Sequence, residues 1–259
     1  MAAILVGPAS AKLVEQEETY TAGDTEMRGF IVYDDAVEGL RPGVLVVPEW
    51  WGLNDYARHR ARMLAEQGYI AMAVDMYGNG AVMDNPGDAG EAATAVLSNP
   101  QLALSRMRAA RALLDAQTRM DPARLAVIGY CFGGTIALNF ARAGEDAKLI
   151  ASFHGGLAAK TSARPGEIKA RVIAYRGLAD VTVPEEVVKA FKKEMKDAGA
   201  DYKLIEYPDA KHGFTVVEND ARAAEFNLPI GYNAAADANS WSDLLAELKT
   251  TFAPPAVEE

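Results

Sequence analysis

Short apolar runs that alternate with helix-length amphipathic segments constrain the fold of this chain more than any other feature. After Gly39, the runs are residues 44–47, 70–74, 125–128, 149–153, 172–175 and 202–207. Strands of a parallel sheet lie between two layers of helices, so they are buried on both faces and read as continuous apolar runs. The alternation therefore predicts an α/β fold, with a mostly parallel central sheet of about eight strands and helices on both faces.

Residues 1–35 have a different pattern. Residues 12–20 and 26–33 alternate in character on either side of the turn residues 21–24, which predicts an antiparallel hairpin of the same sheet. At 259 residues, half of them apolar, the chain fits a single domain over 1–259, with residues 254–259 expected as a flexible tail. Helices are expected at residues 56–67, 90–117, 132–142, 185–198 and 236–252.

Composition limits the partners and the compartment. A net charge of -10 argues against nucleic acid, which is bound by clustered Lys and Arg, and we expect the basic stretch at 58–62 to be a solvated helix face. The single cysteine excludes an internal disulfide. The first residues lack the pattern of a secretory signal, and the apolar runs are far shorter than the roughly 20 residues that cross a bilayer. We therefore expect a cytoplasmic protein with no membrane segment.

The only cysteine lies in a glycine-rich turn, Gly129-Tyr-Cys-Phe-Gly-Gly134, directly after a predicted strand. Glycine two positions before and after a nucleophile removes collisions with the adjoining strand and helix, and the following helix directs its N–H groups and dipole at Cys131. The pattern predicts a nucleophile elbow with a thiol in place of the usual serine hydroxyl. The alternatives are an inert buried cysteine and a dinucleotide loop, which a side chain at Cys131 disfavours.

Two further residues fit a catalytic order with Cys131. Asp180 and His212 each lie in a loop after a predicted strand, where ligands bind in open α/β sheets. The order nucleophile, acid, histidine is that of the α/β-hydrolase fold. Singly, Asp180 is typical of a turn or cap and His212 of a surface loop, but together with Cys131 they predict a triad. His154 precedes Asp180 and is expected to be a structural or pocket-wall residue.

These residues resemble the dienelactone hydrolases, which are α/β-hydrolases with a Cys-Asp-His triad. The matching segments are Pro48-Glu-Trp-Trp-Gly52, Asp75-Met-Tyr77, the elbow, the Asp180 loop, Lys211-His-Gly-Phe214 and the stretch from Tyr232 to Trp241, so the resemblance spans nearly the whole chain. The resemblance implies that Glu49 touches the resting thiol and controls its ionisation. It also implies that the N–H groups of Trp50 and Phe132 form an oxyanion hole.

The alternative for Glu49 is a partly buried carboxylate paired with Arg41, Arg58 or Arg60. Three dispersed histidines without an H-E-x-x-H motif predict no metal site, and the chemistry needs no cofactor.

The chain also departs from the family pattern. Dienelactone hydrolases that act on the chlorocatechol-pathway lactone carry two arginines that grip the substrate carboxylate, and this chain has Asn79 and Val216 at those places. We therefore expect neutral esters or lactones as substrates, in a pocket formed by Trp51, Tyr77, Asn79 and His154. Residues 76–99 are expected to form its variable wall.

The predicted function is a carboxylic ester hydrolase that cleaves small esters or lactones through a thioester acyl-enzyme, with water as the second substrate. Two rival functions remain open. One is a non-catalytic small-molecule receptor on the same fold, and the other is a thiol-based redox sensor that uses Cys131. The oligomeric state is not predicted.

Overall fold

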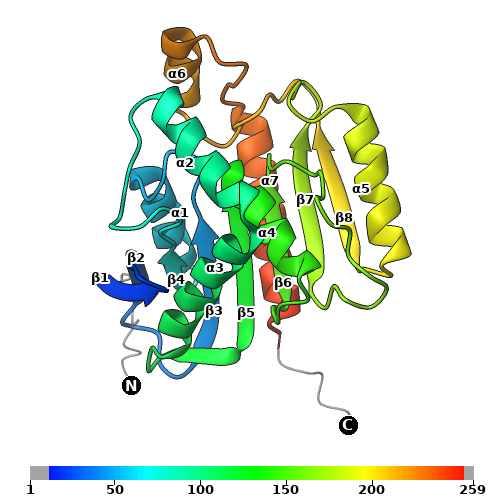
Figure 1. Cartoon of the computed structure of the whole chain (residues 1–259). Coiled ribbons are helices and arrows are strands. Elements are labelled where there is room, and N and C mark those ends of the chain that lie inside the picture. Colours follow the sequence, from blue (N-terminus) through cyan, green and yellow to red (C-terminus); the bar gives the residue numbers. More distant parts are fainter. Residues whose placement is uncertain (1–11, 254–259) are drawn as a thin grey trace, which may run out of the picture.

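An eight-stranded sheet with the strand order β1-β2-β4-β3-β5-β6-β7-β8 forms the centre of the computed structural model, which describes residues 12–253 (Figure 1). The strands are β1 (Leu13–Ala22), β2 (Thr25–Asp34), β3 (Arg41–Val47), β4 (Ile70–Ala73), β5 (Met120–Tyr130), β6 (Leu149–Phe153), β7 (Arg171–Gly177) and β8 (Tyr202–Tyr207). The helices are α1 (Asp55–Ala65), α2 (Pro86–Ser98), α3 (Pro100–Asp115), α4 (Phe132–Arg142), α5 (Glu185–Asp197), α6 (Asn219–Phe226) and α7 (Ala234–Thr251).

Parallel pairing connects β4, β3, β5, β6, β7 and β8, while β1 pairs antiparallel with β2 and β2 antiparallel with β4. The predicted α/β fold with a mostly parallel sheet is confirmed. So is the N-terminal hairpin, as far as residues 13–34 show it. Residues 1–11 of the expected hairpin segment and the expected tail at 254–259 lie outside the described residues.

The sheet separates two apolar cores because successive residues of a strand point to opposite faces. In β3, Leu45 and Val47 join the core that helices α2 to α5 cover, whereas Val44 and Val46 join the core that α1 and α7 cover. Figure 1 shows α3 and α4 on one face of the sheet and α7 on the other. All four of these valine and leucine side chains are fully buried, which explains why the strand sequence is apolar throughout.

The single helix expected over 90–117 is wrong, because the segment forms two helices, α2 and α3. Pro100 has no N–H group and disfavours helical geometry in the residue before it, so a continuous helix cannot pass this point. Asn99 instead begins the second helix, and its side chain accepts a hydrogen bond from the N–H group of Leu102 at 3.1 Å. The turn at Asn99-Pro100 redirects the chain across the face of the sheet.

The expected solvated face at 58–62 is wrong for Arg60, which is 4% exposed. Its guanidinium forms an ion pair with Asp237 of α7 and donates hydrogen bonds to the Thr215 carbonyl and the Tyr56 hydroxyl, both at 3.0 Å. A buried guanidinium is tolerated only when its donors are satisfied. Arg60 therefore ties α1 to α7 and to the loop that carries His212.

No helix among residues 12–253 is long and apolar enough to cross a membrane, and no group of three or more His, Cys, Asp or Glu side chains in that range is placed to hold a metal ion.

Candidate active site

Cys131 occupies the sharp turn between β5 and α4. Its φ of +53° is in the left-handed region, where the backbone of any residue other than glycine is strained. A Cβ atom on Gly129 would overlap the carbonyl of Gly133, and one on Gly133 would overlap the carbonyl of Val47. The turn can therefore form only with glycine at both places, as the sequence pattern predicts. It leaves the thiol partly exposed at the carboxyl edge of the sheet.

The structure brings the side chains of Cys131, His212 and Asp180 together in one line. Nε2 of His212 lies 3.0 Å from Sγ of Cys131, and Nδ1 of His212 lies 2.9 Å from Oδ2 of Asp180. The other carboxylate oxygen, Oδ1, accepts hydrogen bonds from the backbone N–H and hydroxyl of Thr182 at 2.8 and 2.6 Å. Asp180 follows β7 and His212 follows β8, so each group is held at the end of a different strand. This arrangement has the geometry of a nucleophile, a base and an orienting acid.

Neighbouring charges favour the ionised forms of His212 and Asp180. Burial disfavours a charged imidazole, but the Cys131 thiolate and Asp180 outweigh it and raise the pKa of His212 well above its ordinary value. Burial also opposes ionisation of Asp180, yet the hydrogen bonds from His212 and Thr182 lower the pKa of this carboxyl. The site therefore favours an imidazolium at His212 that pairs with the carboxylate of Asp180.

Two backbone N–H groups beside Cys131 donate to no residue within 12–253. Phe132 is the first residue of α4, so its N–H group has no acceptor within the helix. The N–H group of Trp50 likewise donates to no described residue. The close approach of Gly133 to the carbonyls of Val47 and Pro48 places the segment that carries Trp50 directly against the elbow. These two donors are available for an oxygen that develops negative charge.

Glu49 is 3% exposed, and its Oε2 atom has no hydrogen-bond partner among the described residues. Burial raises the pKa of this carboxyl to about 7, although His212 and Arg222 oppose the shift. No hydrogen bond joins Glu49 to Cys131, whose thiol contacts His212 instead. The contact with the resting thiol that the family resemblance implies therefore stays a prediction.

The expected arginine partners of Glu49 are wrong. Arg41 bonds to the Asp34 carbonyl, Arg58 pairs with Glu17, and Arg60 pairs with Asp237. The cation beside Glu49 is Arg222 of α6, which lies 3.9 Å from Oε2 and stacks over the ring of Trp51 at 4.9 Å. Sequence reasoning missed this residue because it placed no helix between residues 207 and 236. Arg222 supplies a positive charge near the site from α6, whereas the two arginines of the family pattern correspond to Asn79 and Val216, which lie outside this helix.

His154 lies beneath the elbow. It is 1% exposed with a φ of +41°. Its Nδ1 atom accepts a hydrogen bond at 3.1 Å from the N–H group of Cys131, which also donates to the Phe153 carbonyl at 2.9 Å. Because Nδ1 is the acceptor, the ring hydrogen is on Nε2, which donates to Oγ1 of Thr215 at 2.8 Å. Oγ1 of Thr215 in turn lies 2.6 Å from the hydroxyl of Tyr56. Of the two roles expected for His154, the structural one fits this position.

Burial and the positive charges of His212 and Arg60 lower the pKa of His154 well below its ordinary value. A neutral ring is the form that can accept from the Cys131 N–H group. The buried chain from His154 to Thr215 thus connects the elbow to the loop of His212 and holds both at a fixed separation.

The other expected pocket residues occupy different surroundings. Tyr77 donates a hydrogen bond to the Trp50 carbonyl at 2.8 Å and packs 5.6 Å from the ring of Phe132, beside the elbow. Trp51 is 3% exposed and packs against the ring of Trp50. Asn79 is exposed, and its N–H group bonds to the carbonyl of Glu26 in β2.

Val216, at the place of the second family arginine, is fully buried. Neither Asn79 nor Val216 provides a cation to the site.

Comparisons with known proteins agree with this fold. The model of the dienelactone hydrolase family matches residues 27–252 of the chain. A Synechocystis sp. protein that is provisionally named a carboxymethylenebutenolidase is 28% identical over 230 residues, which are 83% of this chain and 88% of that protein. A protein named usf from Aquifex pyrophilus is 30% identical over 178 residues, which are 67% of this chain and 76% of that protein.

Among solved structures, a dienelactone hydrolase-like promiscuous phosphotriesterase from metagenomic libraries superposes with a TM-score of 0.88 and 32% identity, over 93% of this chain and 99% of that chain. The likeness extends over nearly the whole chain. The chain therefore belongs to the dienelactone hydrolase family and is an ester-cleaving hydrolase with the α/β-hydrolase fold.

Proposed function

We propose that this hydrolase cleaves small neutral carboxylic esters or lactones, with Cys131 as the nucleophile and a thioester acyl-enzyme as the intermediate. The observation that carries the proposal is the unbroken line of contacts at 3.0 and 2.9 Å from the Cys131 sulfur through His212 to Asp180. An inert structural cysteine has no need of a buried acid and base in this order.

In the first step, the Cys131 thiolate attacks the carbonyl carbon of the ester, and the N–H groups of Phe132 and Trp50 stabilise the oxyanion. The tetrahedral intermediate collapses as the bond to the alcohol oxygen breaks. His212, present as the imidazolium, donates its Nε2 proton to the leaving alkoxide. The alcohol departs and the acyl group stays on the sulfur.

In the second step, neutral His212 takes a proton from water, and the resulting hydroxide attacks the thioester carbonyl. The same two N–H groups stabilise the second oxyanion. The thiolate leaves with the electrons of the carbon–sulfur bond, and it remains paired with the imidazolium of His212. Asp180 stabilises that imidazolium and fixes the orientation of the ring. The carboxylic acid product is then released.

Glu49 supports this cycle as a regulator of thiol ionisation. Its carboxyl has a pKa near 7 and lies close to His212, so its charge alters the balance between thiolate and thiol. We attribute the preference for neutral substrates to the lack of a cationic side chain at positions 79 and 216, which are Asn79 and Val216. The nearby cation, Arg222, lies beside the carboxylate of Glu49. Because the nucleophile is a thiol, a reducing compartment such as the cytoplasm suits the enzyme.

A neutral phosphotriester is a second candidate substrate. The favouring observation is the close structural likeness to a protein named as a promiscuous phosphotriesterase. The Cys131 thiolate would attack phosphorus and expel the alkoxide or aryloxide that His212 protonates, and water would then cleave the phosphorus–sulfur bond.

The test is hydrolysis of p-nitrophenyl acetate by the wild-type chain and by Cys131→Ala and Cys131→Ser variants, with folding verified by circular dichroism. We expect Cys131→Ala to lower kcat at least 1000-fold, on the order of losses seen when a nucleophile is removed. Rapid acid quench and mass spectrometry should detect an acetyl group on Cys131 of the wild-type chain.

Unchanged turnover in Cys131→Ala would reject the thioester mechanism. If the wild-type chain binds esters without turnover, the receptor reading gains support. If peroxide instead oxidises Cys131 reversibly and no ester is cleaved, the redox-sensor reading does.

A further inference from the structure

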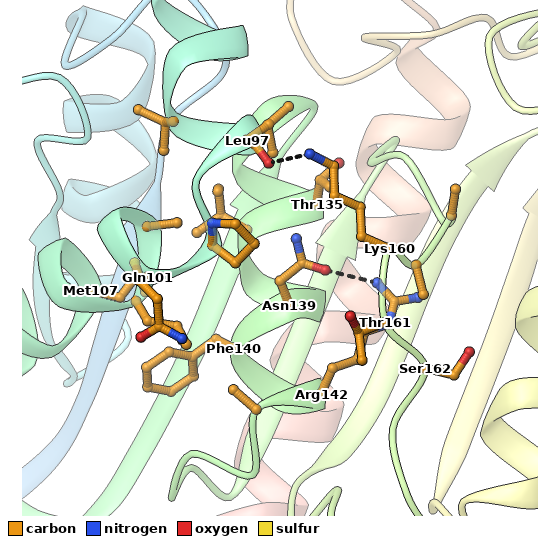
Figure 2. A pocket seen from close by; sticks show the side chains of 18 of the residues that line it. Leu97, Gln101, Met107, Thr135, Asn139, Phe140, Arg142, Lys160, Thr161 and Ser162 are labelled. Atoms are coloured by element: carbon orange, nitrogen blue, oxygen red, sulfur yellow. Dashed lines mark hydrogen bonds between the residues drawn. The ribbon is translucent and has the colours of Figure 1, made fainter.

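A cavity lies along α4, away from the catalytic residues. This cavity of about 480 Å³ is bounded by α2 and α3 on one side, by α4, and by the loop of residues 158–164 (Figure 2). Cys131 and His212 are not among its lining residues. Thr135 lines one end, and it is one turn of α4 beyond Cys131. The hydroxyl of Thr135 accepts a hydrogen bond from the Gly156 N–H group at 3.0 Å, which ties α4 to the loop after β6 at that end.

Most of the cavity wall is apolar. The buried side chains that contribute to it come from three helices and are Val96, Ala103, Met107, Ile136 and Phe140. None of them is more than 6% exposed, so they form a packed floor below the open mouth. A wall of this kind favours an aliphatic chain or ring.

One amide is held in place inside the cavity. Oδ1 of Asn139 accepts a hydrogen bond from Arg142 at 3.1 Å, and Arg142 is itself fixed by Glu194 at 2.9 Å and by the Leu157 carbonyl at 2.8 Å. The orientation of the amide is therefore set, and its Nδ2 group faces away from Arg142 (Figure 2). Nδ2 donates to no described residue, so two N–H bonds are available to a ligand.

A lysine supplies the positive charge at the mouth. Lys160 uses one of its three donors on the Leu97 carbonyl at 3.0 Å and has no ion pair with a described residue, whereas Arg164 on the same loop pairs with Glu167 at 3.8 Å. Glu167 is the only carboxylate of a lining residue, and it accepts a hydrogen bond from the Arg164 N–H group at 2.8 Å. The ammonium of Lys160 is therefore the unpaired charge at the mouth, and it is complementary to an anion.

From these contacts we infer that the cavity binds a carboxylic acid with an apolar chain. The chain lies against Met107 and Phe140, and the carboxylate lies between Nζ of Lys160 and Nδ2 of Asn139, which are the ammonium and amide donors that carboxylates accept. The volume is in the range of small-molecule sites. This site is separate from the one at Cys131, and its occupation requires no bond to be broken.

The test is isothermal titration calorimetry of the full-length chain with decanoate. We expect one saturable site, and weaker binding both of decanol, which lacks the charge, and of acetate, which lacks the chain. Asn139→Asp keeps the Oδ1 acceptor for Arg142 but replaces the donor with a second carboxylate oxygen. It should weaken decanoate binding roughly tenfold or more, and so should Lys160→Gln. Lys169→Gln changes an exposed lysine outside the cavity and should bind as the wild type does.

Three outcomes would overturn the inference. The first is wild-type affinity in both Asn139→Asp and Lys160→Gln. The second is competitive inhibition of p-nitrophenyl acetate hydrolysis by decanoate with an inhibition constant equal to its Kd, because the ligand would then occupy the catalytic site. The third is sedimentation evidence that a second copy of the chain covers the cavity mouth and that decanoate does not bind. The calorimetry needs no turnover, so failure of the proposed esterase mechanism and failure of this inference are distinguishable.

Discussion

Two regions of this molecule, the catalytic site at Cys131 and the cavity along α4, are built in opposite ways. At the catalytic site, Cys131 and His154 both have strained positive φ angles, and their polar groups are partnered in continuous chains. Along α4, the wall is apolar and Nδ2 of Asn139 has no partner among the described residues. The difference follows from the function of each region, which is catalysis at Cys131 and ligand binding in the cavity.

Chemistry requires atoms to be held within a few tenths of an ångström, and binding of an apolar chain does not. Strain at a backbone position persists only where the surrounding contacts force it. At Cys131 these contacts are the backbones of Gly129 and Gly133 and the ring of His154. None of the residues that line the cavity has a positive φ angle, so no strained backbone position is held there.

The largest effect that would test this comparison is expected for Asp180→Asn. The amide would donate a hydrogen bond to Nδ1 of His212 and so favour the wrong tautomer, with the ring hydrogen on Nε2. We expect kcat for p-nitrophenyl acetate to fall roughly 10³- to 10⁴-fold with little change in the melting temperature. Asp24→Asn, in the exposed turn after β1, is the matched control and should retain full activity. Activity within tenfold of wild type in Asp180→Asn would show that the line of contacts is not required.

A smaller effect is expected for Glu49→Gln, which should change how the free energy of unfolding depends on pH. Because burial raises the pKa of Glu49 from 4.5 to about 7, the folded state holds a proton that the unfolded chain has lost between these pH values. The free energy of unfolding of the wild-type chain therefore falls as pH rises through this window, by roughly 3 kcal/mol for this group. Glutamine does not ionise, so the variant does not lose this free energy as pH rises.

We therefore expect Glu49→Gln to gain roughly 3 kcal/mol relative to wild type between pH 4.5 and pH 8, measured by urea unfolding at each pH. Glu38→Gln, which replaces an exposed carboxyl, is the control and should stay within about 0.5 kcal/mol of wild type. A stability difference that is constant over the same range would mean that Glu49 titrates normally.

The smallest effect is expected when a threonine of the catalytic site and a threonine of the cavity mouth are each replaced by valine. Thr215→Val removes the hydroxyl that accepts from Nε2 of His154 and leaves that buried N–H group without a partner. The expected cost is about 1–3 kcal/mol of unfolding free energy, with a fall in kcat of less than tenfold. Thr161→Val changes an exposed threonine at the cavity mouth and should stay within about 0.5 kcal/mol of wild type. Equal stability of the two variants in urea would contradict the proposed difference between the catalytic site and the cavity.

The strands and the turn at Cys131 were predictable because their causes are local. A run such as 125–128 reads as a buried strand from its own residues, and Gly129 and Gly133 are required by atoms within the same turn or the adjacent strand. The break between α2 and α3 also had a local signal in Asn99-Pro100, and the expectation of one long helix overlooked it.

The partners of the buried polar groups were not predictable in this way. Glu49 lies near Arg222, and Arg60 pairs with Asp237, although each couple is far apart in sequence. Nothing in the residues around Glu49 distinguishes Arg222 from the arginines at 41, 58 and 60. Choice among several chemically equivalent partners is made by packing of α1, α6 and α7, so it exists only in the folded chain.

The sequence by itself thus determined the alternation of strands and helices, the elbow and the order Cys131, Asp180, His212, because each depends on backbone sterics and on the residues next to it. The tertiary structure decided that His154 supports the elbow through Thr215, that Arg222 is the cation beside Glu49, and that a cavity lies along α4. These features depend on distances between segments that are remote in the chain, and such distances are fixed only when the two cores pack against the sheet.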